Sequence, residues 1–303
     1  MKILFFGTPY FSEVILGGLV ERGFEVVGVV CQNDKPAGRG NKLVSPHIVE
    51  YANKLGLPVF QFEKLSLYIE EFKKIDYDLA VTASYGKFLP KKLLDLHPCV
   101  NVHPSMLPKY RGATPIQSAL LNGDTKTGVT IMQTGVGMDD GDVFVQEEVE
   151  ILPEDDYSSL MPRLANVGLD LLCDTLKKIE NGTAQKTAQD GEKATFVKLI
   201  QKEDALLDFS ATAQSQVNKV RAFCEDPVAF FFLGEDRIKV YKAKNADDVQ
   251  GEMGMVIPNK KRFLIGTGKG VFEILQCQVQ GGKVLDAKSF LNGYRFKTMA
   301  VSL

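Results

Sequence analysis

Residues 2–31, with the sequence KILFFGTPYFSEVILGGLVERGFEVVGVVC, decide the fold class. The run Lys2–Phe6 is almost continuously apolar, which is typical of a strand that is buried on both faces. Gly7–Pro9 then turns the chain, Tyr10–Arg22 has apolar residues at helical spacing, and Glu25–Cys31 follows as a second strand. Strand, helix and strand in this order predict a parallel α/β unit, the beginning of a Rossmann-like sheet.

The same alternation continues through the first two thirds of the chain. We expect strands at Pro58–Phe60, Leu79–Ala83, Gly128–Met132 and Val143–Ile151, and helices after Ser45-Pro46, after Thr114-Pro115 and over Tyr157–Glu180. From about residue 209 the pattern changes to short strand-like runs at even spacing, which are typical of a small barrel. The predicted organisation is therefore a Rossmann-like, mostly parallel α/β domain over residues 1–190, a linker over 191–208 and a C-terminal β-barrel (OB-like) domain over 209–303.

Length, composition and charge exclude several classes of protein. The 303 residues carry a net charge of −2, and no apolar stretch is long enough to span a membrane or to form a signal peptide, so we expect a cytoplasmic protein. Five cysteines without a C-x-x-C pair argue against a disulfide framework and a zinc site. Residues 209–303 contain 14 Lys and Arg against 9 Asp and Glu. This excess suits a phosphate-rich partner, or it is a chance asymmetry of a solvated surface.

An amide, an imidazole and a carboxylate form the candidate catalytic set. Asn101 and His103 lie two residues apart at the end of an apolar run, so their side chains point to the same face of the predicted strand. Open α/β sheets bind ligands at such strand ends. Asp139, Asp140 and Asp142 follow later in the chain. The three side-chain types suit acyl transfer, which needs a donor to an oxyanion and a group that moves a proton. The alternative is a strand end that binds loop backbone, followed by an ordinary acidic turn.

These residues lie within a longer motif. NVHPSMLPKYRG at residues 101–112, followed by GVTIMQTGVGMDDGD at 128–142, resembles the signature of the folate-dependent formyltransferases. Those enzymes pass the formyl group of 10-formyltetrahydrofolate to an amine. The resemblance implies that Asn101, His103 and Asp139 are catalytic, and it selects Asp139 among the three acidic residues because the family has a D-x-G turn.

The resemblance also implies a folate site. Its residues are expected in the segment YGKFLP (85–90) and in the segment after His103, namely Tyr85, Gly86, Phe88, Leu89, Ser105, Met106, Leu107 and Pro108. Met106 replaces a leucine of the family pattern, a volume-conserving exchange. For Phe88 and Leu89 the alternative is simple core packing.

Two kinds of cofactor are not expected. The turn Gly7–Pro9 has one glycine where the dinucleotide fingerprint needs three, which argues against NAD. A single acidic turn at 139–142 seldom makes a metal cage, so we expect no metal.

The loop DKPAGRGNK at residues 34–42 suggests a tRNA partner. Lys35, Arg39 and Lys42 lie among glycines and a proline, which suits a flexible loop that orders on phosphates, although a solvated surface loop is the alternative. The loop resembles an insertion in the family members that formylate methionyl-tRNA, and Arg39 matches its key arginine. That resemblance covers nearly the whole chain, although Phe223–Pro227 departs from the usual Pro-Trp-Pro segment. It implies formylation of the α-amino group of initiator methionyl-tRNA for translation initiation, by a monomer with no membrane partner.

Two alternative functions are open at this stage. One is another enzyme with the same catalytic core, which acts on an amino-sugar nucleotide or hydrolyses formyltetrahydrofolate; the loop around Arg39 argues against it. The other is a non-catalytic RNA- or folate-binding protein. The complete set of Asn101, His103 and Asp139 argues against the second alternative.

Overall fold

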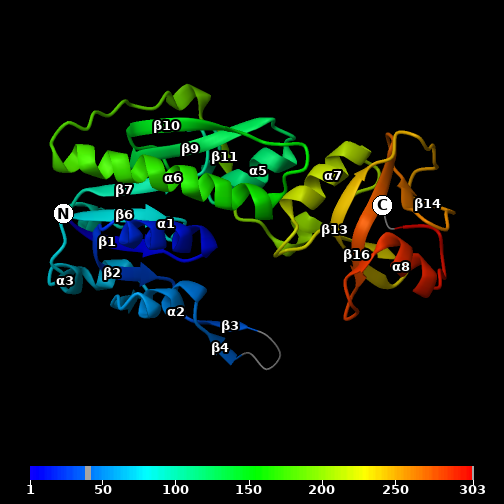
Figure 1. The fold of residues 1–303 in the computed structure, drawn as a ribbon, viewed down its shortest axis with the longest axis horizontal. Coiled ribbons are helices and arrows are strands. Elements are labelled where there is room, and N and C mark those ends of the chain that lie inside the picture. Colours follow the sequence, from blue (N-terminus) through cyan, green and yellow to red (C-terminus); the bar gives the residue numbers. More distant parts are fainter. Residues whose placement is uncertain (38–41, 302–303) are drawn as a thin grey trace. The chain divides into compact units, whose positions relative to one another are not determined.

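The structure, a computed structural model, describes residues 1–37 and 42–301. Its contacts divide the chain into two compact units (Figure 1). The first unit contains Met1–Pro115, Lys126–Glu150 and Met161–Lys198, and the second contains Ile116–Thr125, Ile151–Leu160 and Leu199–Leu303. We describe each unit by itself.

A seven-stranded sheet forms the centre of the first unit, in the order β10-β9-β7-β6-β1-β2-β5. The five parallel strands are β1 (Lys2–Gly7), β2 (Glu25–Cys31), β5 (Val59–Gln61), β6 (Leu79–Ala83) and β7 (Cys99–His103). Strand β9 (Lys126–Gln133) is antiparallel to β7, and β10 (Val143–Glu150) is antiparallel to β9. The prediction of a Rossmann-like, mostly parallel sheet is confirmed.

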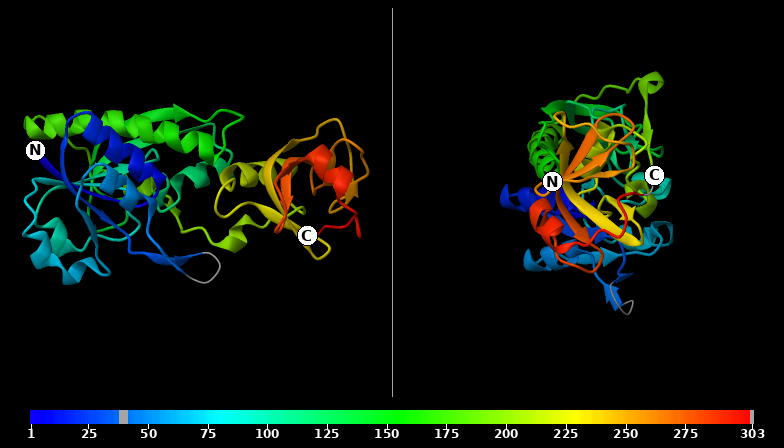
Figure 2. Two further views of the ribbon diagram at one scale, coloured as in Figure 1. Left: turned by 60° about the horizontal axis from the view of Figure 1, so that its bottom comes forward. Right: turned by 90° about the vertical axis from the view of Figure 1, so that its right-hand side faces the viewer.

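Helices α1 (Tyr10–Glu21) and α6 (Tyr157–Glu180) lie together on one face of this sheet (Figures 1 and 2). Two glycines permit the close approach: a Cβ at Gly18 would lie 1.9 Å from Leu169 Cδ2, and one at Gly168 would lie 2.7 Å from Val102 Cγ1. Helix α2 (His47–Lys54) packs beside α1. No helix among residues 1–37 and 42–301 is long and apolar enough to cross a membrane.

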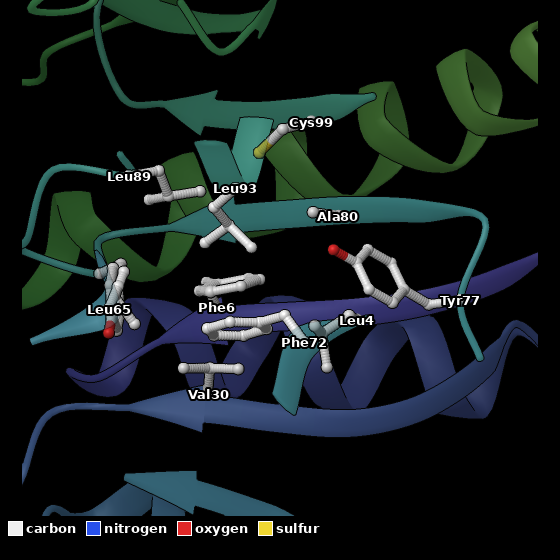
Figure 3. Packing of buried hydrophobic residues seen from close by; sticks show 11 residues of the cluster. Leu4, Phe6, Val30, Leu65, Phe72, Tyr77, Ala80, Leu89, Leu93 and Cys99 are labelled. Carbon is white, nitrogen blue, oxygen red and sulfur yellow. The ribbon is translucent and has the colours of Figure 1, made fainter. Parts of the chain in front are cut away.

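The opposite face carries an aromatic cluster (Figure 3). Leu4, Phe6, Val30 and Ala80 come from the strands, and the covering residues come from η1 (Leu65–Leu67), α3 (Ile69–Phe72), α4 (Lys91–Leu94) and their connections. Phe6 stacks on Phe72, with ring centroids 6.0 Å apart. With both faces covered, the strands are buried as their apolar sequences predict.

The second unit contains an antiparallel sheet that curls into a half-barrel. Its path is β12-β13-β16-β15-β14, and β17 pairs with β16. The strands are β12 (Phe230–Leu233), β13 (Asp236–Asn245), β14 (Val256–Ile257), β15 (Phe263–Gly266), β16 (Val271–Val279) and β17 (Leu285–Asp286). Helices α7 (Ala213–Ala222) and α8 (Ala287–Gly293) accompany them, and α5 (Pro115–Leu121) begins at its predicted proline. Fully buried Phe209, Phe231, Phe263 and Phe272 form the core. The prediction of a small C-terminal β domain is confirmed.

Two short strand pairs lie in segments that the sequence assigned to a loop and a linker. Strand β3 (Lys35–Ala37) pairs with β4 (Lys42–Val44), so the ends of the predicted loop form a hairpin. Strand β8 (Arg111–Gly112) pairs in parallel with β11 (Phe196–Val197), which lies in the predicted linker. The short helices η2 (Gly191–Lys193) and η3 (Lys202–Ala205) also lie there. Part of the predicted linker is therefore ordered against the first unit.

Candidate active site

Strand β7 delivers two polar side chains to the edge where the parallel strands end. In the parallel register Thr82 of β6 is the partner of Asn101, and in the antiparallel register Thr130 of β9 is the partner of His103. Both threonines are buried. Asn101 and His103 therefore each have one strand neighbour with a hydroxyl side chain.

The side-chain amide of Asn101 has a defined orientation. Its Oδ1 accepts a hydrogen bond from Thr82 Oγ1 at 2.9 Å, so the Nδ2 end is the one that faces the site. Nδ2 donates to Asp139 Oδ1 at 3.3 Å. Because an amide nitrogen only donates, the edge of the sheet presents a hydrogen-bond donor here.

The ring of His103 is almost fully buried, with 5% of its side chain exposed. Nε2 lies 2.9 Å from the carbonyl oxygen of Tyr110, which only accepts, so Nε2 carries a hydrogen. Nδ1 is then the nitrogen that faces Asp139 Oδ2, at 3.6 Å. That separation is too long for a direct hydrogen bond but lies within the range of an ion pair. Nδ1 is therefore the nitrogen available for chemistry.

Asp139 is the acidic residue that the structure brings to Asn101 and His103. Its Oδ2 also accepts from the backbone N–H of Gly112 at 2.8 Å, and its backbone is left-handed, with φ 47°. The carboxylate of Asp140 instead turns back on Gly137, where an added Cβ would lie 2.1 Å from Oδ2. The backbone carbonyl of Asp142 accepts from the N–H of Gln133. Asn101, His103 and Asp139 thus come together as the sequence motif predicts.

Sequence reasoning missed the residues that hold this set. Gln189 donates through Nε2 to the carbonyl oxygens of Asp139, at 2.9 Å, and Gly141, at 2.8 Å. Its Oε1 accepts from buried Arg111. The only sequence signal for Thr82 was a hydroxyl within a buried apolar strand. Gln189 had no signal, because it lies in a polar segment without a motif, directly before the predicted linker.

The segment after His103 is tied to β9 and β10. Ser105 is fully buried, and its hydroxyl donates to the carbonyl of Lys109 at 2.6 Å. Thr130 donates to the carbonyl of Ser105 and accepts from the N–H of Leu107, while Gln146 donates to the carbonyl of Leu107. The Pro108 carbonyl accepts from Thr195. Buried, mutually bonded groups of this kind make a rigid loop.

Met106 and Leu107 are packed within the same segment. The thioether of Met106 lies against Gly128, where an added Cβ would be 2.4 Å from Sδ, and Leu107 is buried. These two side chains support the loop from the side of the sheet.

The segment after β6 has a buried and an exposed part. Tyr85 packs edge-on to Phe6, with centroids 5.5 Å apart, and burial raises the pKa of Tyr85. Leu89 belongs to the same cluster, whereas Phe88 is 69% exposed. Gly86 has φ 75°, and a Cβ there would lie 2.6 Å from Gln32 Nε2. Because β6 and β7 are adjacent and parallel, this segment and Ser105–Pro108 follow strands that end at the same edge.

Two of the three basic residues predicted for tRNA, Lys35 and Lys42, lie in the β3–β4 hairpin. Lys35 is exposed and donates to Gln32 Oε1 at 2.7 Å. Lys42 begins β4, and Arg39 lies outside the described residues. Among residues 1–37 and 42–301, no three His, Cys, Asp or Glu side chains gather so that they could hold a metal ion.

Comparisons with known proteins agree with this geometry. The family described as "Formyl transferase" matches residues 1–176, and "Formyl transferase, C-terminal domain" matches residues 199–295. The chain belongs to the formyl transferase family. As a member, it is 43% identical over 298 residues to the methionyl-tRNA formyltransferase of Lactobacillus johnsonii, covering 96% of this chain and 95% of that protein. It is 38% identical to the methionyl-tRNA formyltransferase of Thermodesulfovibrio yellowstonii, covering 96% and 95%.

A solved structure shares the fold. The N-formyltransferase from Helicobacter canadensis, in complex with folinic acid and dTDP-3-aminofucose, superposes with a TM-score of 0.68 at 19% identity, covering 90% of this chain and 98% of that one. At this identity the likeness concerns the fold alone.

Proposed function

We propose that this enzyme transfers the formyl group of 10-formyltetrahydrofolate to the α-amino group of initiator methionyl-tRNA. The products are formylmethionyl-tRNA, which serves translation initiation, and tetrahydrofolate. Methionyl-tRNA formyltransferases of 38–43% identity match over almost their whole length and support this acceptor. The observation that carries the proposal is the meeting of Asn101 and His103, from the end of β7, with the carboxylate of Asp139.

The reaction is an acyl transfer between two nitrogens. The neutral amine attacks the formyl carbon and a C–N bond forms, while the formyl oxygen gains negative charge. The bond from the formyl carbon to N10 of the folate then breaks, and the amine gives up one proton while N10 takes up one. The site must therefore donate to an oxyanion and move a proton.

Asn101 Nδ2 is our proposed donor to the oxyanion. Thr82 holds the amide with its nitrogen toward the site, so no rotation is needed when charge develops. The contact to Asp139, at 3.3 Å, is long enough to be exchanged for a contact to substrate.

His103 and Asp139 are our proposed proton-handling pair. With Nε2–H committed to the Tyr110 carbonyl, Nδ1 takes the amine proton when the ring is neutral and donates when it is charged. The carboxylate of Asp139 lies 3.6 Å from Nδ1. In this scheme Asp139 stabilises the imidazolium that forms as the amine loses its proton.

The folate site is proposed between the two segments that follow β6 and β7. Tyr85, Gly86, Phe88 and Leu89 form one side, and Ser105, Met106, Leu107 and Pro108 form the other. Exposed Phe88 offers an apolar surface to a flat ring, while buried Tyr85 and Leu89 hold its segment in place. The chemistry above uses no metal.

Contact with tRNA is proposed for two regions of the chain. Arg39, Lys35 and Lys42 in and beside the hairpin would contact the acceptor end, and the basic C-terminal region would contact phosphates. We propose a catalytic domain over 1–190, a linker over 191–208 and a tRNA-contacting domain over 209–303. A monomer in the cytoplasm suits this role.

The test is transfer of labelled formyl from 10-formyltetrahydrofolate to methionyl-initiator-tRNA, with His103→Ala in parallel. We expect transfer by the wild type and a loss of at least a hundred-fold in the variant. His47→Ala is the matched control, because His47 is exposed on α2. Transfer to an amino-sugar nucleotide instead of tRNA would overturn the acceptor, and equal activity of His103→Ala would overturn the site.

The role of the loop is tested separately with Arg39→Ala. We expect slower turnover with tRNA and unchanged folate affinity, because the guanidinium would contact phosphate only. An equal loss of folate affinity would mean that the loop supports the folate site.

A further inference from the structure

Gln189 joins two loops that are far apart in the sequence. Its Nε2 donates to the carbonyl oxygens of Asp139 and Gly141, at 2.9 and 2.8 Å. Its Oε1 accepts from Arg111 Nε and Nη2, at 3.1 and 2.8 Å. One half-buried amide thus engages the turn that carries Asp139 and the strand β8 that contains Arg111.

The orientation of this amide is fixed by chemistry. A guanidinium only donates and a carbonyl only accepts, so Oε1 must face Arg111 and Nε2 must face Asp139 and Gly141. A flipped amide would set donors against donors and acceptors against acceptors. Arg111 is 8% exposed, so its fork is held in a fixed position for Gln189.

These hydrogen bonds of the Gln189 side chain, called the tether below, act on a residue with a left-handed backbone. Asp139 has a left-handed backbone, with φ 47°, a conformation that a residue with a Cβ adopts less readily than the right-handed one. Relaxation of this φ would rotate the Asp139 side chain away from its present partners. Bonds to the carbonyls on both sides of Asp140 oppose that relaxation.

The contacts also close a ring. Gly112 follows Arg111 in β8, and its N–H donates to Asp139 Oδ2 at 2.8 Å. The carboxylate is therefore bonded to β8 directly, and the backbone of the same residue is bonded to β8 through Gln189 and Arg111. The side chain and the backbone of Asp139 are therefore both linked to β8, and β8 itself pairs with β11.

We propose that Gln189 is a positioning residue, which holds the Asp139 carboxylate at its distance from His103 Nδ1 and from Asn101 Nδ2. Arg111 orients the amide of Gln189. This inference rests on the proposed function, because it assigns Gln189 a role in that reaction. Gln189 itself touches no reacting atom in this scheme.

The kinetic test compares Gln189→Leu and Gln189→Glu with the wild type. Leucine removes both ends of the tether, whereas glutamate keeps an acceptor for Arg111 and removes the donors. We expect kcat to fall about ten- to a hundred-fold in both, with KM for folate and tRNA within two-fold, because a misplaced group costs rate rather than binding. Gln185→Leu, an exposed glutamine of the same segment, is the control. Unchanged kcat would overturn the proposal.

A second measurement does not depend on turnover. The chain has three histidines, so their ring nitrogens can be followed individually by NMR with labelled histidine. We expect Gln189→Leu to move the His103 ring signals in the same direction as Asp139→Ala, while those of His47 and His97 stay in place. Unmoved His103 signals would overturn the positioning role. Absence of transfer by the wild type would instead count against the proposed function, and the ring signals would still decide the role of Gln189.

Discussion

Clustered polar side chains satisfy their hydrogen bonds differently in the two units. In the first unit, Asn101, His103 and Asp139 are each held by a protein group, namely Thr82, the Tyr110 carbonyl and the Gly112 N–H. The distances among the three side chains are 3.3–3.6 Å, longer than a good hydrogen bond. The protein orients these side chains but leaves them hydrogen-bonding capacity that a substrate can use.

The second unit contains a charged cluster that saturates itself. Arg262 pairs with Asp248 through both terminal nitrogens, at 2.6 and 2.9 Å, and with Glu273 at 2.6 Å. Lys244 lies 3.7 Å from Glu273, whose side chain is 7% exposed. Opposite charges meet at bonding distance, so this cluster is structural. The comparison teaches that loose contacts between well-held groups, rather than burial alone, mark the candidate site.

The largest expected effect is on the loose contacts of the first unit. Asn101→Ala removes the proposed oxyanion donor, so we expect kcat to fall about a hundred- to a thousand-fold with little change in KM. Asn53→Ala, on the exposed side of α2, is the control. Steady-state kinetics with both substrates would measure this, and a variant with normal kcat would show that Asn101 only shapes the loop.

The next effect concerns the saturated cluster of the second unit. Arg262→Met leaves Glu273 buried without its principal cation, so we expect the midpoint of thermal unfolding to fall by several degrees. Formyl transfer at low temperature should change less than two-fold. Lys261→Met, at an exposed neighbour, should leave the midpoint in place. Calorimetry is the measurement, and an unchanged midpoint would contradict a structural role for the cluster.

A smaller effect is expected from the hydroxyl that orients Asn101. Thr82→Val keeps the shape of the side chain and removes its bond to Asn101 Oδ1, so the amide can turn. One hydrogen bond is worth about 1 kcal/mol, so we expect kcat to fall about five-fold. Thr175→Val removes a comparable buried bond, to the Leu171 carbonyl at 2.7 Å, away from the site. Equal loss of kcat in both variants would argue for a general effect of packing.

The smallest expected effect concerns the reactivity of buried cysteine thiols, which should be the same in both units. Burial raises the pKa of Cys31, in the first unit, to about 11 and the pKa of Cys277, in the second, to about 12. With a pKa of about 11, only about a thousandth of Cys31 is present as the reactive thiolate at pH 8. We therefore expect both thiols to be alkylated slowly until denaturant is added. Mass spectrometry of the alkylated protein would measure the two rates. Fast labelling of one of them would show that its unit opens more readily.

Local patterns in the sequence were enough for the architecture. The apolar run from Ile3 to Phe6, the turn at Gly7 and the periodic segment after it predicted the parallel sheet, because strand and helix periods are written in consecutive residues. The spacing of Asn101 and His103 predicted one shared face, since residues two apart in a strand point the same way. The ends of the segment 34–42 read as loop but form the β3–β4 hairpin, because pairing between Lys35–Ala37 and Lys42–Val44 is a tertiary contact that composition does not record.

By itself, the sequence determined a mostly parallel α/β unit, a following β unit and the motif that contains the three candidate catalytic residues. Only the tertiary structure decided which nitrogen of His103 faces the carboxylate of Asp139 and which end of the Asn101 amide points inward. It also decided that Gln189, 50 residues beyond Asp139 in the chain, holds that residue. The physical reason is range: periodicity and turn chemistry act between near neighbours, whereas the orientation of a side chain depends on the donors and acceptors that folding brings beside it.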